Sequence, residues 1–329
     1  MKFEDLTPDQ LRVAVVGAGR MGRERASTSA RCGASVVAVC DPDLDCGQKL
    51  ADEHSRCQYM ANWEELDWST LDAVFVCTPP FARGPVELAA IEAGVPFFVE
   101  KPIGLSAQHA QPIRDALRRR PVLNAVGYMN RYRESVQRAR TALTGQAVLG
   151  ATSRWLCGNY RVSWWGQKQL SGGPLNEQAT HLVDLTRFLL GEVTEVQALV
   201  EPRDWQTSQI QTAVINLRLA SGALHSIFYS CQAATKWIGF EAFTADCHVQ
   251  LDGWDLQWRD ANGTVPNPTT DRSAIFRDEV QAFFNAIRSG SPTILCDFED
   301  AFRTQQTVDA IHEALARADA SQSDEFKVS

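Results

Sequence analysis

A histidine and two carboxylates stand at helical intervals in the middle of the chain. The stretch from Ser171 to Asp184 opens with glycines and a proline and then has a helical pattern, in which Glu177, His181 and Asp184 stand at i, i+4 and i+7. These intervals predict one shared helix face. A carboxylate one turn from an imidazole can orient it and raise its proton affinity, which suits proton transfer near neutral pH. A solvated polar stripe is the alternative interpretation of the same spacing.

A glycine-rich turn near the N-terminus predicts a dinucleotide site. The β-branched run Arg12–Val16 ends at Gly-Ala-Gly-Arg-Met-Gly, and residues able to form a helix follow. Gly17 permits a tight turn, Gly19 lets a pyrophosphate approach the backbone, and Gly22 lets the helix pack on the strand. The helix N-terminus offers further N–H groups to phosphate. The predicted cofactor contacts in this turn are Gly17, Gly19, Arg20, Met21 and Gly22.

An aspartate at the end of the second predicted strand bears on the choice of dinucleotide. Asp41 follows the apolar run Val36–Cys40, where an acidic side chain can accept hydrogen bonds from the adenosine ribose hydroxyls. Its charge would repel a 2′-phosphate, so the sequence favours NAD over NADP as the cofactor. A turn residue before Pro42 is the alternative interpretation.

Strands and helices continue to alternate through the first part of the chain. Apolar runs at 73–77 and 96–99 predict buried parallel strands, and open parallel sheets bind ligands at the carboxyl ends of their strands. Thr78 and Pro79 follow the first run, and Glu100 and Lys101 follow the second, so all four are candidate cofactor contacts. A solvated surface lysine is the alternative for Lys101.

The pattern changes after residue 126, where we expect a domain boundary. The first domain is expected over residues 1–126 and the second over 127–329, with Tyr128 and Arg131 as candidate substrate contacts just past the last strand of the first domain. Alternating runs predict antiparallel strands in the second domain at 147–156, 193–200, 213–219, 223–231 and 238–245. The predicted class is therefore α/β, with a doubly wound parallel sheet followed by an α/β domain.

Composition limits the partners. A formal net charge of -8 argues against nucleic acid or an anionic membrane surface as the main partner. No run approaches the roughly 18 apolar residues of a membrane span, and the first residues do not resemble a secretory signal. We therefore expect a cytoplasmic protein with a small-molecule ligand. The nine cysteines never stand as Cys-x-x-Cys and the six histidines show no paired ligand spacing, so neither a disulfide framework nor a metal site is predicted.

An aromatic segment precedes the stretch that contains His181. Aromatic rings stack on the C–H faces of sugars, and a guanidinium can bind hydroxyls or a carboxylate, so this segment is a candidate for substrate selection. Packing in the core is an equally weighted alternative. Trp164 and Trp165 are favoured as ligand contacts over Trp155, which belongs to a predicted strand. The segment comprises Trp155, Tyr160, Arg161, Trp164 and Trp165.

These motifs together resemble the glucose-fructose oxidoreductase, inositol dehydrogenase and rhizopine-catabolism (Gfo/Idh/MocA) family. The resemblance rests on Val15 to Gly22, Cys77 to Pro80, Ala93 to Pro96 with Glu100 to Pro102, and Gly172 to His181. It implies a Rossmann domain followed by an α/β domain with a large, mostly antiparallel sheet that often mediates dimers or tetramers. It also implies NAD(P)-dependent oxidation or reduction of a hydroxyl/carbonyl pair on a sugar, cyclitol or related polyol.

The same resemblance implies roles for individual residues. Lys101 would lie near the nicotinamide and the reacting oxygen, His181 would contact the substrate and transfer the proton, and Glu177 would be their partner. For Asp184, a turn further along the helix, we expect a structural or helper role. The chain departs from the family at Glu177, where aspartate is frequent, and at Arg83, where many members have histidine. The substrate stays open. A redox-neutral glycoside hydrolase that uses NAD transiently, and an NAD-sensing regulator without catalysis, are the alternative functions.

Overall fold

The protein consists of two compact units. The computed structural model describes residues 10–160, 162–201, 211–259, 273–290 and 294–325. The first unit comprises the described residues within 1–104, 108–129 and 273–301, and the second those within 105–107, 130–272 and 302–329. The change at residue 129 lies three positions past the predicted boundary, and residues 273–301 return to the first unit, which a division into 1–126 and 127–329 does not include.

A six-stranded parallel sheet forms the centre of the first unit, in the order β3-β2-β1-β4-β5-β6. Its strands are β1 (Arg12–Val16), β2 (Ser35–Cys40), β3 (Gln58–Met60), β4 (Ala73–Val76), β5 (Phe97–Val99) and β6 (Asn124–Val126). The side chains of β4 and β5 are fully buried. Uninterrupted apolar runs form these strands because helices cover both faces of a doubly wound sheet. The predicted parallel sheet is confirmed.

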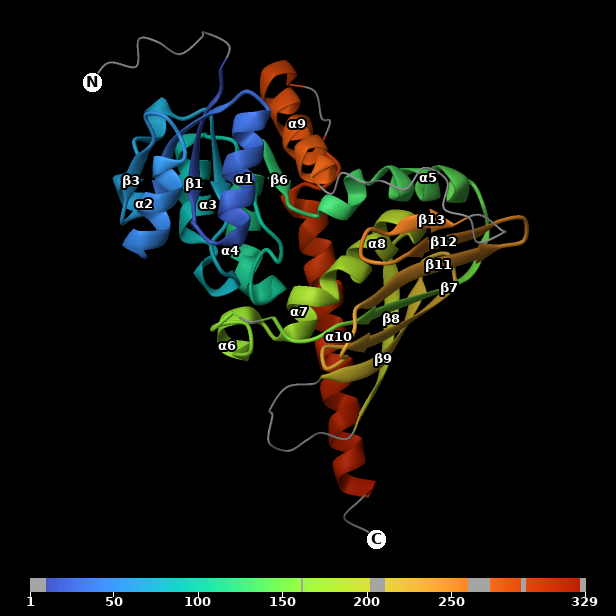
Figure 1. Ribbon diagram of the computed structural model, residues 1–329. Helices are drawn as coiled ribbons and strands as arrows, with labels where there is room; N and C mark the ends of the chain where they lie inside the picture. The colour runs from blue at the N-terminus through green and yellow to red at the C-terminus, as the bar shows by residue number, and fades with distance from the viewer. Residues whose placement is uncertain (1–9, 161, 202–210, 260–272, 291–293, 326–329) are drawn as a thin grey trace. The chain divides into compact units, whose positions relative to one another are not determined.

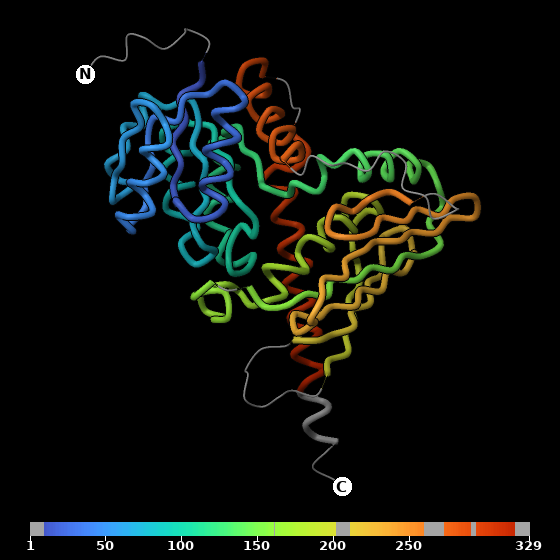
Figure 2. The backbone as a smooth tube through the Cα atoms, in the orientation of Figure 1, coloured from blue at the N-terminus to red at the C-terminus, as the bar shows by residue number. Residues whose placement is uncertain are grey.

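The helices of the first unit come from two distant parts of the chain. They are α1 (Arg20–Arg31), α2 (Leu44–Asp52), α3 (Pro85–Ala93), α4 (Ala107–Arg119) and α9 (Ala274–Ser289), with 3-10 turns η1 (Trp63–Glu65), η2 (Trp68–Thr70) and η3 (Pro80–Ala82). A further 3-10 turn, η4 (Met129–Tyr132), follows β6, and all but its first residue belong to the second unit. Figure 2 shows the late segment of α9 lying against segments from the start of the chain, and α9 contacts α1 (Figure 1).

Four phenylalanines explain why α9 belongs to the first unit. Phe283 of α9 packs edge to face on Phe75 of β4 and Phe98 of β5, with ring centroids 5.8 Å apart in both pairs. Phe284 meets Phe75 in the same way at 6.1 Å. All four rings are fully buried. Because edge-to-face pairs add to the energy of burying apolar area, this cluster joins α9 to the sheet firmly.

The second unit contains a seven-stranded, mostly antiparallel sheet in the order β13-β12-β11-β7-β10-β9-β8. Only the β7–β10 pair is parallel among its described pairings. The strands are β7 (Val148–Leu156), β8 (Val193–Val200), β9 (Thr212–Leu219), β10 (Leu224–Ser230), β11 (Trp237–Thr244), β12 (His248–Asp252) and β13 (Gln257–Arg259). The mostly antiparallel sheet implied by the family resemblance is confirmed, with β12 as a strand that sequence reasoning missed.

One face of this sheet packs against helices. The helices of the unit are α5 (Glu134–Leu143), α6 (Lys168–Ser171), α7 (Pro174–Gln178), α8 (Thr180–Leu190) and most of α10 (Phe298–Glu325). Their shared core includes Val136 of α5, Leu182 of α8 and Ile311 of α10 against Ile215 and Ile227 of the strands. The opposite face alternates polar and exposed apolar side chains, as antiparallel sheets with one open face do.

Candidate active site

The glycine turn in the first unit has the shape that a dinucleotide requires. Gly17 has φ +100°, and a Cβ there would lie 2.7 Å from the carbonyl of Cys77. A Cβ on Gly22 would lie 1.8 Å from the oxygen of Gly17, so neither position tolerates a side chain. A Cβ on Gly19, by contrast, would meet no atom within 4 Å. The open space beside Gly19, at the N-terminus of α1, therefore fits a pyrophosphate.

Asp41 directs its carboxylate back to this turn. Its Oδ2 accepts a hydrogen bond from the backbone N–H of Ala18 at 2.6 Å, and its Oδ1 accepts one from Asp43 at 2.8 Å. The side chain is half-buried at the end of β2. A carboxylate has lone pairs beyond these two bonds, so Asp41 can still accept from ribose hydroxyls. The predicted ribose contact thus fits the position of the side chain.

The end of β4 carries the next candidates. Thr78 and Pro79 follow β4 directly, and the buried Oγ1 of Thr78 has no hydrogen-bond partner among the described residues. A buried hydroxyl without a partner is costly unless a ligand satisfies it, so this atom fits a bound cofactor. Arg20, at the start of α1, is exposed, and Met21 is half-buried.

Arg83, one of the departures from the family pattern, bonds to the protein itself. It is 4% exposed, and its Nη1 donates to the carbonyl of Val76 at the end of β4. Burial raises the pKa of the fully buried Glu87 carboxyl, and the charge of Arg83 partly offsets this. The carboxylate of Glu87 also accepts from the N–H of Gly84 at the start of α3. Arg83 therefore bonds to the end of β4, and its charge stabilises the carboxylate of Glu87 in the first turn of α3.

The end of β5 carries Glu100 and Lys101. Glu100 is 3% exposed, and Arg25 of α1 holds its carboxylate, with Nε 2.6 Å from Oε1. Lys101 is half-buried and is followed by a cis peptide bond to Pro102. All the predicted cofactor contacts thus lie in the first unit, in the segments that follow β1, β2, β4 and β5. Tyr128, buried after β6, lies in the same unit.

In the second unit, two short helices replace the single predicted helix. Gly172 and Gly173 have φ of +78° and +96°, and the chain then forms α7 and α8, which meet at Ala179. Ala179 joins the two helices directly, because its N–H donates to the carbonyl of Leu175 at 2.9 Å and its carbonyl accepts from the N–H of Val183 at 3.0 Å. Glu177 in α7 and His181 in α8 are both buried. The roles predicted for both residues stay predictions.

A tryptophan fixes the plane of the His181 ring. The indole of Trp155 in β7 stacks on the imidazole, with centroids 5.3 Å apart and 12° between the planes. Trp254 meets Trp155 edge to face at 5.6 Å. Because Trp155 and His181 are 2% and 4% exposed, the imidazole has little freedom to rotate. Sequence reasoning assigned Trp155 to a strand and did not connect it with His181.

The other aromatic candidates divide between core and partial exposure. Trp165 is 2% exposed and contacts Tyr160, with ring centroids 5.3 Å apart. Trp164 is half-buried and packs against the same core. Arg161 lies outside the described residues. The substrate contacts predicted for Trp164 and Trp165 stay predictions, with Trp164 the more accessible of the two.

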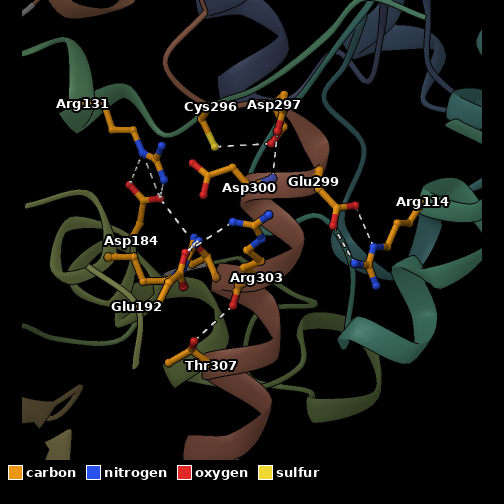
Figure 3. Close-up of polar contacts among 12 residues, drawn as sticks. Arg114, Arg131, Asp184, Glu192, Cys296, Asp297, Glu299, Asp300, Arg303 and Thr307 are labelled. Atoms are coloured by element: carbon orange, nitrogen blue, oxygen red, sulfur yellow. Dashed lines mark hydrogen bonds and ion pairs between the residues drawn. The ribbon is translucent and has the colours of Figure 1, made fainter. Parts of the chain in front are cut away.

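Arg131 and Asp184 form a buried ion pair. Arg131 Nη2 lies 2.6 Å from Asp184 Oδ1, and Nε lies 3.0 Å from Oδ2 (Figure 3). Thr304 of α10 adds a 3.5 Å hydrogen bond to the same carboxylate. Phe188 packs on the guanidinium, whose Cζ lies 4.8 Å from the ring centroid. The pair gives Asp184 a structural role, which is one of the two roles expected for it. Arg131, expected to contact substrate, is 2% exposed, and its guanidinium is paired with Asp184.

A second polar contact fastens α8 from the side of the sheet. His225 of β10 lies between Thr186 of α8 and Ser153 of β7, with Nδ1 2.9 Å from Thr186 Oγ1 and Nε2 2.9 Å from Ser153 Oγ. Burial lowers the pKa of His225 to about 3, so the ring is neutral. Thr186 Oγ1 donates to the carbonyl of Leu182 at 2.7 Å. Its hydroxyl therefore accepts from His225, which places the ring proton on Nδ1.

Within the described part of the chain, no group of three or more histidine, cysteine, aspartate or glutamate side chains could hold a metal ion. No described helix is long and apolar enough to cross a membrane. The first unit offers a phosphate turn and a carboxylate for ribose, and the second offers the buried carboxylate of Glu177 and the imidazole of His181. These are the groups that a dinucleotide-dependent proton and hydride transfer needs.

The fold and the glycine turn define an NAD-binding oxidoreductase. The oxidoreductase family with an NAD-binding Rossmann fold matches residues 11–128, and the GFO/IDH/MocA C-terminal domain matches residues 146–250. Inositol 2-dehydrogenase 4 of Saccharopolyspora erythraea is 31% identical over 309 residues, which cover 85% of this chain and 86% of that relative. The chain belongs to the Gfo/Idh/MocA family.

Other relatives act on sugars. D-glucoside 3-dehydrogenase of Escherichia coli is 31% identical over 203 residues, or 56% of each chain. Among solved structures, levoglucosan dehydrogenase in complex with NADH and levoglucosan has a TM-score of 0.83 at 20% identity, covering 94% of this chain and 98% of that one. GenD2 from gentamicin A biosynthesis, in complex with NAD, has a TM-score of 0.80 at 24% identity and covers 94% of both chains. These two structures share the fold.

The buried ion pair yields a stability prediction. Asp184→Asn should lower the free energy of unfolding by about 3–5 kcal/mol, because it leaves the Arg131 guanidinium buried without its carboxylate. Urea unfolding followed by circular dichroism measures this loss. Glu195→Gln is the matched control, since Glu195 and Arg218 form an ion pair in the same unit with both side chains about half exposed. Similar small effects for the two variants would contradict the structural role of Asp184.

Proposed function

We propose that this NAD-dependent oxidoreductase transfers a hydride between nicotinamide and a hydroxyl-bearing carbon of a sugar, cyclitol or related polyol. The observation that carries the proposal is the cofactor turn at Gly17 to Gly22, found in a chain 31% identical to an inositol 2-dehydrogenase over most of both lengths. The buried Glu177 and His181 supply groups for the accompanying proton transfer.

The proposed mechanism assigns a task to each of three side chains. Bound NAD supplies the hydride acceptor. Oxidation of a carbinol requires the loss of its O–H proton, which an imidazole nitrogen of His181 accepts. The ammonium of Lys101 donates a hydrogen bond to the same oxygen and stabilises its developing negative charge. Glu177, four positions before His181, orients the imidazole and raises its proton affinity. In the reverse direction, His181 returns the proton.

The stacked indole of Trp155 supports this role for His181. Stacking at 12° on a buried indole fixes the orientation of the imidazole plane, so proton transfer needs no rotation of the ring. For substrate contacts we retain Tyr128, Arg131, Trp164 and Trp165. Trp164 is the strongest of these because it is only partly buried and can offer a ring face to a sugar.

An assay with a polyol and glycoside panel tests the function. The purified protein is incubated with NAD or NADP and with myo-inositol, scyllo-inositol, D-glucosides or levoglucosan, and NADH formation is followed at its absorption band. We expect NADH to accumulate with at least one compound and faster than NADPH, because Asp41 repels a 2′-phosphate. Release of aglycone without net NADH would instead identify the redox-neutral hydrolase. NAD binding with neither reaction would favour a regulator.

Replacement of the imidazole tests the proposed proton transfer. His181→Ala should lower kcat by on the order of a hundredfold or more, because no other group is assigned to move the substrate proton. Its dissociation constant for NADH, measured by fluorescence titration, should stay close to that of the wild type, since the cofactor contacts lie in the first unit. A variant with wild-type turnover would exclude this role for His181.

The open face of the seven-stranded sheet is the proposed site of self-association. Leu199 of β8 pairs in register with Val214 of β9, which pairs with Phe228 of β10, so an apolar row crosses three strands. Leu199, Phe228 and Trp237 are 62%, 43% and 54% exposed. Exposed apolar rows of this kind mark interfaces. Charged residues on the strands, such as Arg154, are paired with acidic neighbours, so two copies of the face would not repel each other.

Light scattering in solution tests this association. The wild type should have twice or four times the mass of the chain, and Phe228→Asp should shift the protein to the monomer, because a charge would be buried in the interface. Leu44→Asp, at a 59% exposed position on α2, is the control and should leave the mass unchanged. A wild-type monomer would contradict the proposal.

The cytoplasmic location stays a prediction from composition.

A further inference from the structure

A buried arginine connects the cofactor helix to the segment that carries Lys101. Arg25, on α1, is fully buried. Its Nε and Nη2 each lie 2.6 Å from Oε1 of Glu100, and its Nη1 lies 2.7 Å from Oε2 of Glu279 on α9. The two carboxylates are 3% and 1% exposed. One guanidinium thus joins three elements of the first unit that are far apart in sequence.

The surroundings leave these side chains almost no alternative arrangement. The Arg25 guanidinium lies over the ring of Phe98, with Cζ 4.4 Å from the centroid. A Cβ on Gly127 would lie 2.9 Å from Glu100 Oε2 and 3.0 Å from Arg25 Nη2, so the glycine leaves room for only this packing. Burial opposes the charge on Arg25, but the attraction of Glu100 and Glu279 outweighs it and raises the pKa of the guanidinium.

Glu100 is held through its backbone as well. Its N–H donates to the carbonyl of Val76 at 2.9 Å, and the N–H of Gly127 donates to the carbonyl of Val99 at 2.9 Å. The residue is therefore fixed at the carboxyl edge of the sheet by β4, β6 and Arg25 together. Lys101 is the next residue in the chain, so the direction in which its side chain leaves the backbone depends on how firmly Glu100 is held.

We propose that Arg25 and Glu279 are positioning residues for Lys101, acting through the carboxylate of Glu100. The proposal rests on the proposed function, in which Lys101 stabilises charge on the reacting oxygen. It differs from the predicted cofactor contact of Glu100, because the carboxylate is directed at Arg25 in the protein interior. Arginine suits this task because its planar fork can bond two carboxylates at once, which a lysine ammonium cannot do with the same geometry.

Chemical labelling of lysines tests the proposal without any turnover. The full-length wild type and Arg25→Met are treated with an amine-acylating reagent in the absence of substrate, and labelling rates at Lys101 and Lys49 are measured by mass spectrometry. Lys49, exposed on α2 of the same unit, is the internal control. We expect the Lys101 rate to change by about threefold or more, because its ammonium loses its fixed surroundings, and the Lys49 rate to stay the same.

Steady-state kinetics adds a second readout with any substrate that the panel identifies. Arg25→Met should lower kcat by on the order of tenfold to a hundredfold, as misplacement of a charge-stabilising group does. Arg25→Lys should recover part of this loss. In a Lys101→Met background, the Arg25 substitution should change the residual kcat less than about twofold, because residues that act as a unit are not additive.

Two further variants separate positioning from folding. Arg114→Lys, at a bidentate pair with Glu299 in the same unit (Figure 3), should leave Lys101 labelling and kcat unchanged. If Arg25→Met does not fold, Glu279→Gln decides, because it keeps the shape of the cluster and removes one charge. Wild-type labelling of Lys101 in every folded cluster variant, or full additivity with Lys101→Met, would overturn the proposal. A panel without turnover would contradict the proposed function and still leave the labelling result decisive.

Discussion

The placement of α8 depends above all on the buried pair between Arg131 and Asp184. Apolar packing against the sheet is not directional, so it alone would permit several rotations of the helix. Hydrogen bonds, by contrast, are directional. Asp184 on α8 accepts from the guanidinium of Arg131 and from the hydroxyl of Thr304, and Thr186 on α8 bonds to His225, so α8 is held from three different neighbours. Together they select one rotation. His181, one turn before Asp184, then meets the indole of Trp155 in a single orientation.

Much of the fold could be predicted from the sequence because its signals are local. Uninterrupted apolar runs marked the strands of the parallel sheet, and the glycine spacing marked the phosphate turn, where the near-contact between Gly22 and the oxygen of Gly17 allows no other residue. The break at Ala179 was not predictable, since nothing in its residue type interrupts a helix. Strand β12 was missed although its residues alternate between polar and apolar, because a run of five residues is short.

The sequence could not show which side chains contact one another across the fold. A motif fixes where the backbone of Glu100, Arg83 or Trp155 lies, but the direction of each side chain depends on neighbours distant in the chain. Glu100 is 75 residues from Arg25, and Asp184 is 53 residues from Arg131. Charged residues whose partners lie so far away cannot be told from solvated ones by local spacing alone. For this reason, assignments of cofactor and substrate contacts from motif position were weaker than assignments of strands.

The return of α9 to the first unit has a consequence for how the protein is made. During synthesis, the six strands of the parallel sheet leave the ribosome long before Phe283 and Phe284. Until then, Phe75 and Phe98 have no aromatic partners from α9, and Arg25 has only one of its two carboxylates. The first unit is thus completed only after the entire seven-stranded sheet of the second unit has been translated. To exchange this unit between relatives, two separate segments of the gene would have to be replaced.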